Sequence, residues 1–500
     1  MRTVRIALST IIAALLLAIG LPAEAAAATF TLDKAEYTVG TPVTATYTTD
    51  RPDDQNWVGI YSDPGNAPVN GTYVGPSTAW TYAPGASGTV TLPTTSLSPG
   101  AYVAYFLYND GYTSLAAPVR FTVVGAGSQP PAFLADPTPL RNARVDAAYQ
   151  AKIVAVDPDG TKPTYHKVSG PSWATVAADG TVSGTPRVAD VGVSQVVVSA
   201  TDGEGLTARA TATITVRPVG QKLVPEPVVT AFNVWHSGSQ VTDGVTKQLR
   251  FLVSSGSDVV GLSESRGTHA KTMADALGWY SVHNGGDLAI ISKYPLGATF
   301  TAEAGFGARV EFAAGERAVI WDVHLNYTPY GPYDACFDKM SVNKIIARES
   351  QSGRVREIES VLNALAPHKA EGIPVFLVGD FNAPSHRDWT PAAASLHCGY
   401  TVNWPVSQAV ERAGLVDSYR VVNPDPVKMP GNTWSPVYPK HNGSTGVAEP
   451  QDRIDFVYSV GPAQPLTSSA VVRGTPAAVP NHAGNEWASD HAAVVTRFRL

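Results

Sequence analysis

Residues 377–386 read LVGDFNAPSH, an apolar run that ends in Gly-Asp-Phe-Asn before a proline. Such a run is typical of a buried β-strand. If the strand stays extended, the side chains of Asp380 and Asn382 point to the same side of the strand, and Phe381 is buried on the other side. The alternative is an Asx-turn that closes the strand before Pro384.

The same pattern recurs over residues 221–500. Apolar runs such as VVTAFNVW, SDVVGLSE, RAVIWDVHLNY and RIDFVYSV are typical of buried strands, and each stops at a residue that can bind a metal ion or a phosphate. One polar residue at a strand end is common, but several in one domain predict a shared site. The residues that mark these ends are Asn233, Glu264, His324, Asp380 with Asn382, Asp455, and Asp490 with His491.

Two helices are predicted between these strands. In residues 353–367 apolar side chains recur at i, i+3, i+4 and i+7, which indicates an amphipathic helix that ends before Pro367. Residues 242–255 predict another helix, capped by Thr242 or Asp243. Strands mixed with helices predict a layered α/β domain over residues 221–500.

In the order of its motifs, the chain from about residue 226 to its end resembles the endonuclease/exonuclease/phosphatase superfamily. GDFN at 379–382 and SDH at 489–491 are the most specific elements of this resemblance. The superfamily includes apurinic endonucleases, pancreatic-type deoxyribonucleases, neutral sphingomyelinases and inositol polyphosphate 5-phosphatases. The resemblance implies a four-layer sandwich, two packed β-sheets flanked by helices, that hydrolyses a phosphate ester with Mg²⁺, or with Mn²⁺ or Ca²⁺ as alternatives.

The resemblance also assigns metal ligands. Glu264 would be the principal Mg²⁺ ligand, with Asn233 beside it and Asp490 completing the shell. Carboxylate and carboxamide oxygens suit a small, hard cation that keeps several waters.

His491 would be the imidazole that helps to activate the attacking water or stabilises the phosphoryl oxygens, and it needs a carboxylate partner to fix its tautomer. Asp452 and Asp455 compete for that role. They lie three apart in QDRIDF, so on a strand they would point to opposite faces. We favour Asp455, and Asp452 remains the alternative.

The remaining roles follow from the same resemblance. Asp380 would orient or deprotonate the nucleophilic water, and Asn382 would donate its amide hydrogens to the developing oxyanion. His324 would contact the phosphate or protonate the leaving oxygen, with Asp287 as a candidate partner.

A tyrosine-rich stretch follows His324 in the sequence NYTPYGPYDACF. Its three tyrosines could line a substrate rim, although ordinary loop packing explains them equally well. They are Tyr327, Tyr330 and Tyr333.

Two further domains are predicted before the α/β domain. Residues 29–124 alternate apolar and polar side chains between turn signals, which predicts a β-sandwich. Residues 125–132, GAGSQPPA, read as a linker. Residues 133–217 predict a second sandwich that resembles immunoglobulin- or cadherin-like modules.

Residues 1–28 predict a secretory signal peptide, because Arg2 and Arg5 precede an apolar core and a run of small residues. The alternative, a membrane anchor, needs a longer apolar core. No later stretch is apolar enough to span a bilayer, so we expect a secreted, extracellular chain. The chain's two cysteines, Cys336 and Cys398, are then expected to form a disulfide, with two buried thiols as the alternative.

The net charge of −6 and the charged fraction of 16% give no basic footprint. A tight coating of nucleic acid is therefore not expected, although a local patch suffices for an enzyme. The chain has EPQDRID where the 5-phosphatases carry a Trp-Cys-Asp-Arg tetrad. The substrate stays open between nucleic acid, a phospholipid head group and another small phosphate ester.

The alternative hypothesis is that the chain is not an enzyme. It would then be a non-catalytic secreted adhesion or carbohydrate-binding protein whose last domain is a degenerate phosphoesterase. In either reading the two sandwiches could contact a cell surface or a polysaccharide, and we expect a monomer. A complete ligand set favours the enzyme.

Overall fold

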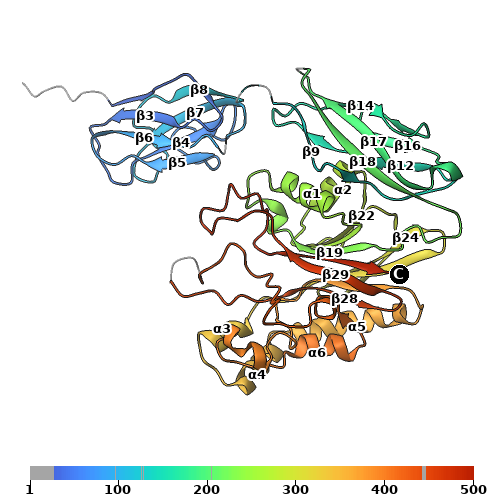
Figure 1. Cartoon of the computed structure of the whole chain (residues 1–500). Helices are drawn as coiled ribbons and strands as arrows, with labels where there is room; N and C mark the ends of the chain where they lie inside the picture. The colour runs from blue at the N-terminus through green and yellow to red at the C-terminus, as the bar shows by residue number, and fades with distance from the viewer. Residues whose placement is uncertain (1–27, 96, 126, 128, 204, 442–445) are drawn as a thin grey trace, which may run out of the picture. The chain divides into compact units, whose positions relative to one another are not determined.

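The computed structural model describes residues 28–500 except 96, 126, 128, 204 and 442–445 (Figure 1). The predicted signal peptide, residues 1–28, lies outside the described residues apart from its last residue. The chain divides into two compact units, Met1–Gly127 and Ser128–Leu500. Within the part of the chain that the structure describes, every helix is too short or too polar to cross a membrane.

The first unit contains a sandwich of a three-stranded and a five-stranded sheet. Its core is apolar and aromatic, and strands such as Val43–Thr48 alternate buried and more exposed residues, as their sequence predicts. The smaller sheet has the order β1 (Thr29–Leu32), β3 (Val43–Thr48), β6 (Ser87–Leu92), and the larger sheet β2 (Glu36–Thr38), β8 (Val119–Val124), β7 (Gly100–Leu107), β4 (Trp57–Ser62), β5 (Ala79–Tyr82).

The second unit begins with an immunoglobulin-like module. Its main sheet has the order β10 (Thr138–Pro139), β18 (Thr207–Arg217), β17 (Gly192–Thr201), β14 (Thr164–Ser169), with β11 (Ala143–Arg144) beside β18. A second sheet has the order β12 (Tyr149–Lys152), β16 (Thr181–Gly184), β15 (Ala174–Val176), and β9 (Ala132–Phe133) pairs with β13 (Ala155–Val156).

The remainder of this unit is the α/β domain, built on two six-stranded sheets. The first sheet has the order β21 (Tyr280–His283), β22 (Leu288–Ser292), β20 (Val259–Ser263), β19 (Val228–Asn233), β30 (Ala493–Arg499), β29 (Gln464–Val471). The second has the order β23 (Leu296–Ala302), β24 (Gly305–Ala313), β25 (Glu316–His324), β26 (Val375–Asp380), β28 (Asp455–Val460), β27 (Val416–Asp417). Side chains from both sheets form one buried cluster, including Val229, Ile290, Ile320, Val378, Val457 and Val494.

Helices cover the outer faces of both sheets (Figure 1). On the first sheet lie α1 (Gly244–Ser254) and α2 (His269–Leu277), and on the second α5 (Arg354–Lys369) and α6 (Pro405–Arg412). The other α-helices of the described residues are α3 (Gly331–Cys336), α4 (Val342–Gln351) and α7 (Ser418–Val422), and 3₁₀ helices span Val188–Asp190, His236–Gly238 and Pro391–Leu396. This is the four-layer arrangement that the sequence resemblance implies.

The helix predicted to end before Pro367 continues to Lys369, so that prediction is wrong. A proline this close to the end of a helix removes little of the hydrogen-bond ladder. His368 also packs on Phe300, with ring centroids 4.2 Å apart, which favours the extra turn.

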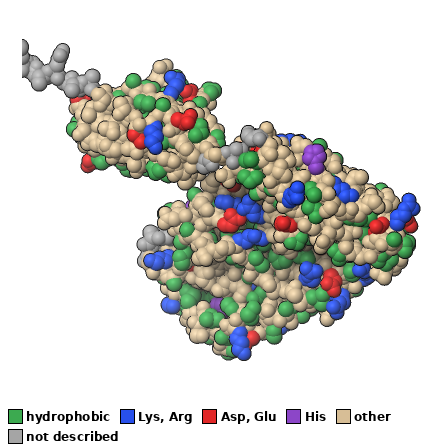
Figure 2. All heavy atoms as spheres, turned by 45° about the horizontal axis from the view of Figure 1, so that its top comes forward, with side chains coloured by type: hydrophobic (Ala, Val, Ile, Leu, Met, Phe, Trp, Pro, Cys, Tyr) green, Lys and Arg blue, Asp and Glu red, His purple; other side chains and the backbone are tan. Residues whose placement is uncertain are grey.

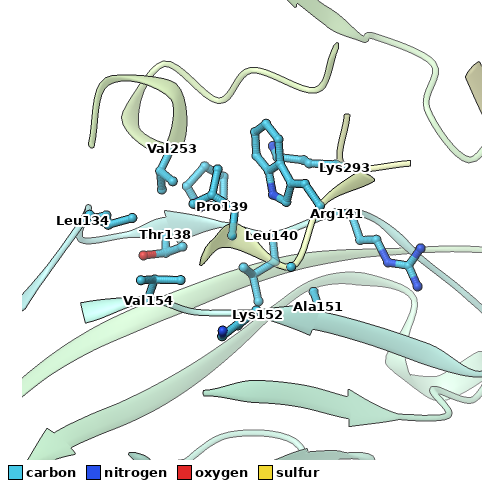
Figure 3. A pocket seen from close by; sticks show the side chains of 13 residues that line it. Leu134, Thr138, Pro139, Leu140, Arg141, Ala151, Lys152, Val154, Val253 and Lys293 are labelled. Carbon is cyan, nitrogen blue, oxygen red and sulfur yellow. The ribbon is translucent and has the colours of Figure 1, made fainter. Parts of the chain in front are cut away.

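The immunoglobulin-like module shares its core with the α/β domain. Leu134 is buried in the same cluster as residues of α1 and α2, including Val253 and Leu277. Arg144 pairs with Glu316 at 2.6 Å across this boundary. Figure 3 shows the adjoining pocket, where side chains of the module such as Leu134 and Val154 lie with Val253 and Lys293 of the domain.

The disulfide expected from the sequence is present: Cys336, the last residue of α3, is bonded to Cys398. It joins two segments that are 62 residues apart in the chain. On the face drawn in Figure 2, Lys and Arg side chains lie interspersed with Asp and Glu.

Candidate active site

The candidate residues meet because of the directions in which the strands of the two sheets run. β19 and β20 run parallel, as do β25 and β26, so their carboxyl ends lie at one edge of the sandwich. β30 and β28 run antiparallel to them, so the beginnings of these two strands reach the same edge. The expectation that all the polar residues stand at strand ends is therefore wrong for Asp455, Asp490 and His491, which stand at or before strand starts.

Two histidine–carboxylate pairs face a single carboxylate. His491 Nδ1 lies 2.8 Å from Asp455 Oδ2, and His324 Nδ1 lies 2.8 Å from Asp287 Oδ2. The Nε2 atom of each ring lies 3.7 Å from the same oxygen, Asp380 Oδ2. Because each Nδ1 is engaged by a carboxylate, each Nε2 is directed into the shared space around Asp380.

The two carboxylates proposed as partners of His491 lie in different surroundings. Asp455 is the first residue of β28 and bonds to His491. Asp452 precedes the strand and instead accepts hydrogen bonds from Trp389 Nε1 at 2.8 Å and Tyr330 Oη at 3.2 Å.

The turn after β26 differs from the extended geometry that would place Asp380 and Asn382 on one face. Asn382 has a φ of 48°, so extension ends at Asp380. The Asn382 N–H donates to Asp380 Oδ1 at 2.8 Å, which is the Asx-turn considered as the alternative. The turn still leaves Asn382 in the site, where Nδ2 donates to Leu325 O at 2.9 Å, and Phe381 is buried as expected.

A second cluster joins Asn233, Glu264 and Asp490. Asn233 Nδ2 lies 3.3 Å from Glu264 Oε1 and 3.2 Å from Asp380 Oδ2, so it bridges the two clusters. Glu264 also accepts the His236 N–H at 2.7 Å. Its φ of 63° is rare for a residue other than glycine, and such strained conformations concentrate at functional sites.

Burial and neighbouring charges shift the pKa values of the two carboxyl groups of this second cluster in opposite directions. Burial raises the pKa of Asp490 to about 7, and the charge of Glu264 adds to the shift. Burial also acts to raise the pKa of Glu264, but the His236 N–H and the charges of His324 and His491 outweigh it, so that pKa falls below its usual value.

Burial is the largest single influence on the pKa of each histidine, but the neighbouring carboxylates together outweigh it. Burial acts to lower the pKa of His491, but Asp455 and Asp380 raise it well above its usual value. In His324 the bond to Asp287 and the charge of Asp380 likewise overcome burial and raise the pKa to about 9. Burial, followed by the charge of Asp455, raises the pKa of Asp380.

The donor set fits a hard divalent cation. Among the described residues, the buried atoms Asp490 Oδ1 and Asp455 Oδ1 have no hydrogen-bond partner. Carboxylates outnumber imidazoles around the site, and ligand atoms of Asp380, Asp455 and His491 lie within 4.8 Å of one another. A cation bound at Asp490 would satisfy its orphaned oxygen and offset the excess negative charge.

Two residues that the sequence interpretation missed hold the site together. Ser489 Oγ donates to Asn233 O at 2.6 Å and accepts the His491 N–H at 3.0 Å, so it ties β19 to the His491 turn. Thr433 Oγ1 accepts the N–H groups of Ile454 and Asp455, each at 3.0 Å. Ser489 is part of the SDH motif, so the sequence offered a signal for it. No motif surrounds Thr433, so the sequence offered no signal for that residue.

The loop that carries Glu264 is anchored by a buried histidine. His269 Nδ1 lies 2.9 Å from Ser265 Oγ, and its Nε2 lies 3.0 Å from Gln248 Oε1 on α1. Burial lowers the pKa of this ring to about 4. The anchor therefore depends on a neutral imidazole.

Acidification from about pH 7.5 to about pH 5 is expected to destabilise the wild-type chain partly through His269, because the unfolded chain protonates this ring near pH 6.5 and the folded chain only near pH 4. The contribution is complete above the unfolded pKa and is lost as the pH falls toward the folded one, by about 2 kcal/mol at pH 5. Urea denaturation at both pH values measures it.

The His269→Gln variant should lose less stability on acidification than the wild type. His166→Gln, at an exposed position of β14, is the matched control and should behave as the wild type. Equal losses in the wild type and His269→Gln would contradict this prediction.

Two packed sheets with paired imidazoles and carboxylates at one edge define a domain of the phosphoesterase-fold class. Comparison with known families supports this: the Endonuclease/Exonuclease/phosphatase family matches residues 230–491, and a putative Ig domain matches residues 130–217. The chain belongs to the endonuclease/exonuclease/phosphatase family. Both resemblances and the multidomain fold class expected from the sequence are thereby confirmed.

Relatives were found among curated proteins and solved structures. An uncharacterized protein of Caenorhabditis elegans is 34% identical over 287 residues, which cover 53% of this chain and 89% of that protein. An AP endonuclease from Archaeoglobus fulgidus is 14% identical, covers 55% of this chain and 100% of its own, and has a TM-score of 0.38. A 3′ phosphatase from Neisseria, bound to a product DNA hairpin, is 18% identical over 55% of this chain and 100% of its own, with a TM-score of 0.36.

Proposed function

We propose that the chain is a secreted, metal-dependent phosphoesterase that hydrolyses a phosphate ester by attack of water. The observation that carries the proposal is the pair of imidazoles, each bonded to a carboxylate at 2.8 Å and each directing Nε2 toward Asp380. Ordinary core packing does not require two such pairs around one buried carboxylate.

The metal would be Mg²⁺, with Mn²⁺ or Ca²⁺ as alternatives. Glu264, Asn233 and Asp490 would hold it, because they form one cluster and because Asp490 Oδ1 has no partner among the described residues. When bound, such a cation supplies positive charge beside the phosphate oxygens.

Four residues of the chain carry out the proton transfers and the charge stabilisation. Asp380 orients the attacking water and takes its proton as the new phosphorus–oxygen bond forms, and Asn382 donates its amide to the developing oxyanion. His491, fixed by Asp455, donates from Nε2 to a phosphoryl oxygen. His324, fixed by Asp287, gives a proton to the leaving oxygen as its bond to phosphorus breaks.

Secretion, partners and assembly are part of the same proposal. The charged and apolar pattern of residues 1–28 supports export. The first sandwich is a separate compact unit, which suits a module that contacts a cell surface or a polysaccharide. We propose that the chain acts as a monomer.

The proposal is tested by incubating the purified full chain with bis(p-nitrophenyl) phosphate and p-nitrophenyl phosphate in the presence of Mg²⁺. We expect release of p-nitrophenol from at least one of them, and the preferred ester separates diesterase from monoesterase activity. A folded, metal-supplied chain that hydrolyses neither, nor DNA, RNA or phospholipid, would instead support the degenerate, non-catalytic reading.

A further inference from the structure

An aromatic pocket lies next to the candidate active site. Four of its six lining residues are aromatic, and none of the six is a lysine or an arginine. Asn382 belongs both to this lining and to the turn that follows Asp380. A substituent on a phosphate held at Asp380 can therefore enter the pocket. The lining residues are Tyr327, Tyr330, Tyr333, Asn382, Trp434 and Ile454.

The polar groups of three of these rings are tied to buried carboxylates. Tyr333 Oη donates to Glu449 Oε1 at 2.6 Å, and Trp434 Nε1 donates to the same oxygen at 2.9 Å. Tyr330 Oη donates to Asp452 Oδ2 at 3.2 Å. Glu449 is only 4% exposed and Asp452 only 1% exposed.

These hydrogen bonds decide which kind of group the pocket attracts. A phenol or indole that donates to a carboxylate is polarised by it, so its ring becomes more negative. The faces of aromatic rings already attract cations. The second oxygen of Glu449 is bonded to His441 Nδ1 at 2.9 Å, and the His441 ring packs against Tyr333 with centroids 4.5 Å apart. The Glu449 carboxyl group therefore joins three aromatic rings into one hydrogen-bonded cluster.

The shape of the pocket favours a compact group over a flat one. The rings of Tyr330 and Tyr333 lie 4.8 Å apart and are nearly perpendicular, at 79°. A flat base is best held between parallel rings, whereas perpendicular rings form the walls of a box. The buried carboxyl oxygens that could accept the N–H groups of a primary ammonium ion are already engaged by the phenol and indole donors.

We propose, on the basis of the function proposed above, that this pocket binds a quaternary ammonium group attached through the substrate's phosphate. The substrate class is then phosphocholine esters. Their cation needs no hydrogen-bond partner and is drawn to aromatic rings. The same chemistry occurs in lipid head groups and in small soluble esters.

A matched pair of chromogenic esters tests this inference. p-Nitrophenyl phosphorylcholine and p-nitrophenyl 3,3-dimethylbutyl phosphate have nearly the same shape, but only the first carries a positive charge. We expect kcat/KM of the wild-type chain to be at least about tenfold higher for the choline ester. Equal values would overturn the inference while leaving the phosphoesterase function intact. Hydrolysis of neither would count against the function itself.

Variants of pocket residues test whether the pocket causes the preference for the choline ester. Tyr327 is 72% exposed, so Tyr327→Leu should fold, and the ratio of the two kcat/KM values should fall toward one. Glu449→Gln should lower the ratio as well. Tyr280→Leu, at a 43% exposed position of the edge strand β21, is the matched control and should keep the wild-type ratio. Wild-type ratios in both pocket variants would overturn the inference.

Natural sources are distinguished by two further substrates. Hydrolysis of sphingomyelin or phosphatidylcholine vesicles would identify a lipid source, and hydrolysis of glycerophosphocholine would identify a soluble one. The p-nitrophenyl ester of thymidine 5′-phosphate represents the alternative, a substrate whose base enters the pocket. If the chain prefers it to the choline ester, the pocket binds a base and the inference is wrong.

Discussion

The His491→Ala variant is expected to hydrolyse bis(p-nitrophenyl) phosphate at least about a thousandfold more slowly than the wild-type chain. His491 is 4% exposed, is bonded to Asp455, and directs Nε2 toward Asp380. Alanine removes the only group of this residue that can reach a phosphoryl oxygen. Initial rates at saturating Mg²⁺ measure the loss.

One control and one milder variant make this result specific. His166→Ala changes an exposed histidine of β14 and should leave the rate unchanged. Asp455→Asn keeps the size of the His491 partner but removes its charge, so it should lower kcat by about a hundredfold or more while leaving KM nearly unchanged. A His491→Ala chain that is folded and as active as the wild type would refute the assignment of this histidine.

The second large effect is expected from removal of the metal. Treatment with EDTA should abolish hydrolysis, and added Mg²⁺ should restore it, because the carboxylates of the site then lose and regain the charge that offsets them. Thermal unfolding followed with and without Mg²⁺ gives a readout that does not depend on activity. Bound metal should raise the midpoint of unfolding.

Glu264→Gln separates the proposed ligand from the rest of the chain. It should raise the Mg²⁺ concentration needed for half-maximal activity by at least about tenfold, because an amide binds the cation more weakly than a carboxylate. Glu359→Gln, on the exposed side of α5, is the matched control. If EDTA has no effect, or if Glu264→Gln needs no more Mg²⁺ than the control, the proposed metal site is wrong.

Sequence patterns anticipated the convergence of the candidate site. Strands that end in polar residues predicted that Asn233, Glu264, His324 and Asp380 share one edge, and the parallel pairs of strands bring them there. The sequence did not show that β28 and β30 run antiparallel to their neighbours, because strand direction depends on long-range pairing.

Other features depend on contacts that local patterns do not encode. The left-handed conformation of Asn382 follows from its bond to the Asp380 side chain, and either an extended strand or a turn was compatible with the sequence. Glu449 binds Tyr333 from 116 positions away in the chain, so no periodicity could reveal it. The helix that continues past Pro367 is stabilised by side chains of the neighbouring sheet.

The joint core of the immunoglobulin-like module and the α/β domain limits how this chain can be divided. Leu134, Ala135, Val154 and Val156 cover apolar side chains of α1 and α2. A polypeptide starting at residue 221 would expose that flank to water and would be prone to aggregate. The first sandwich belongs to a separate compact unit that ends at Gly127, so exchanging it for another module would leave this joint core intact.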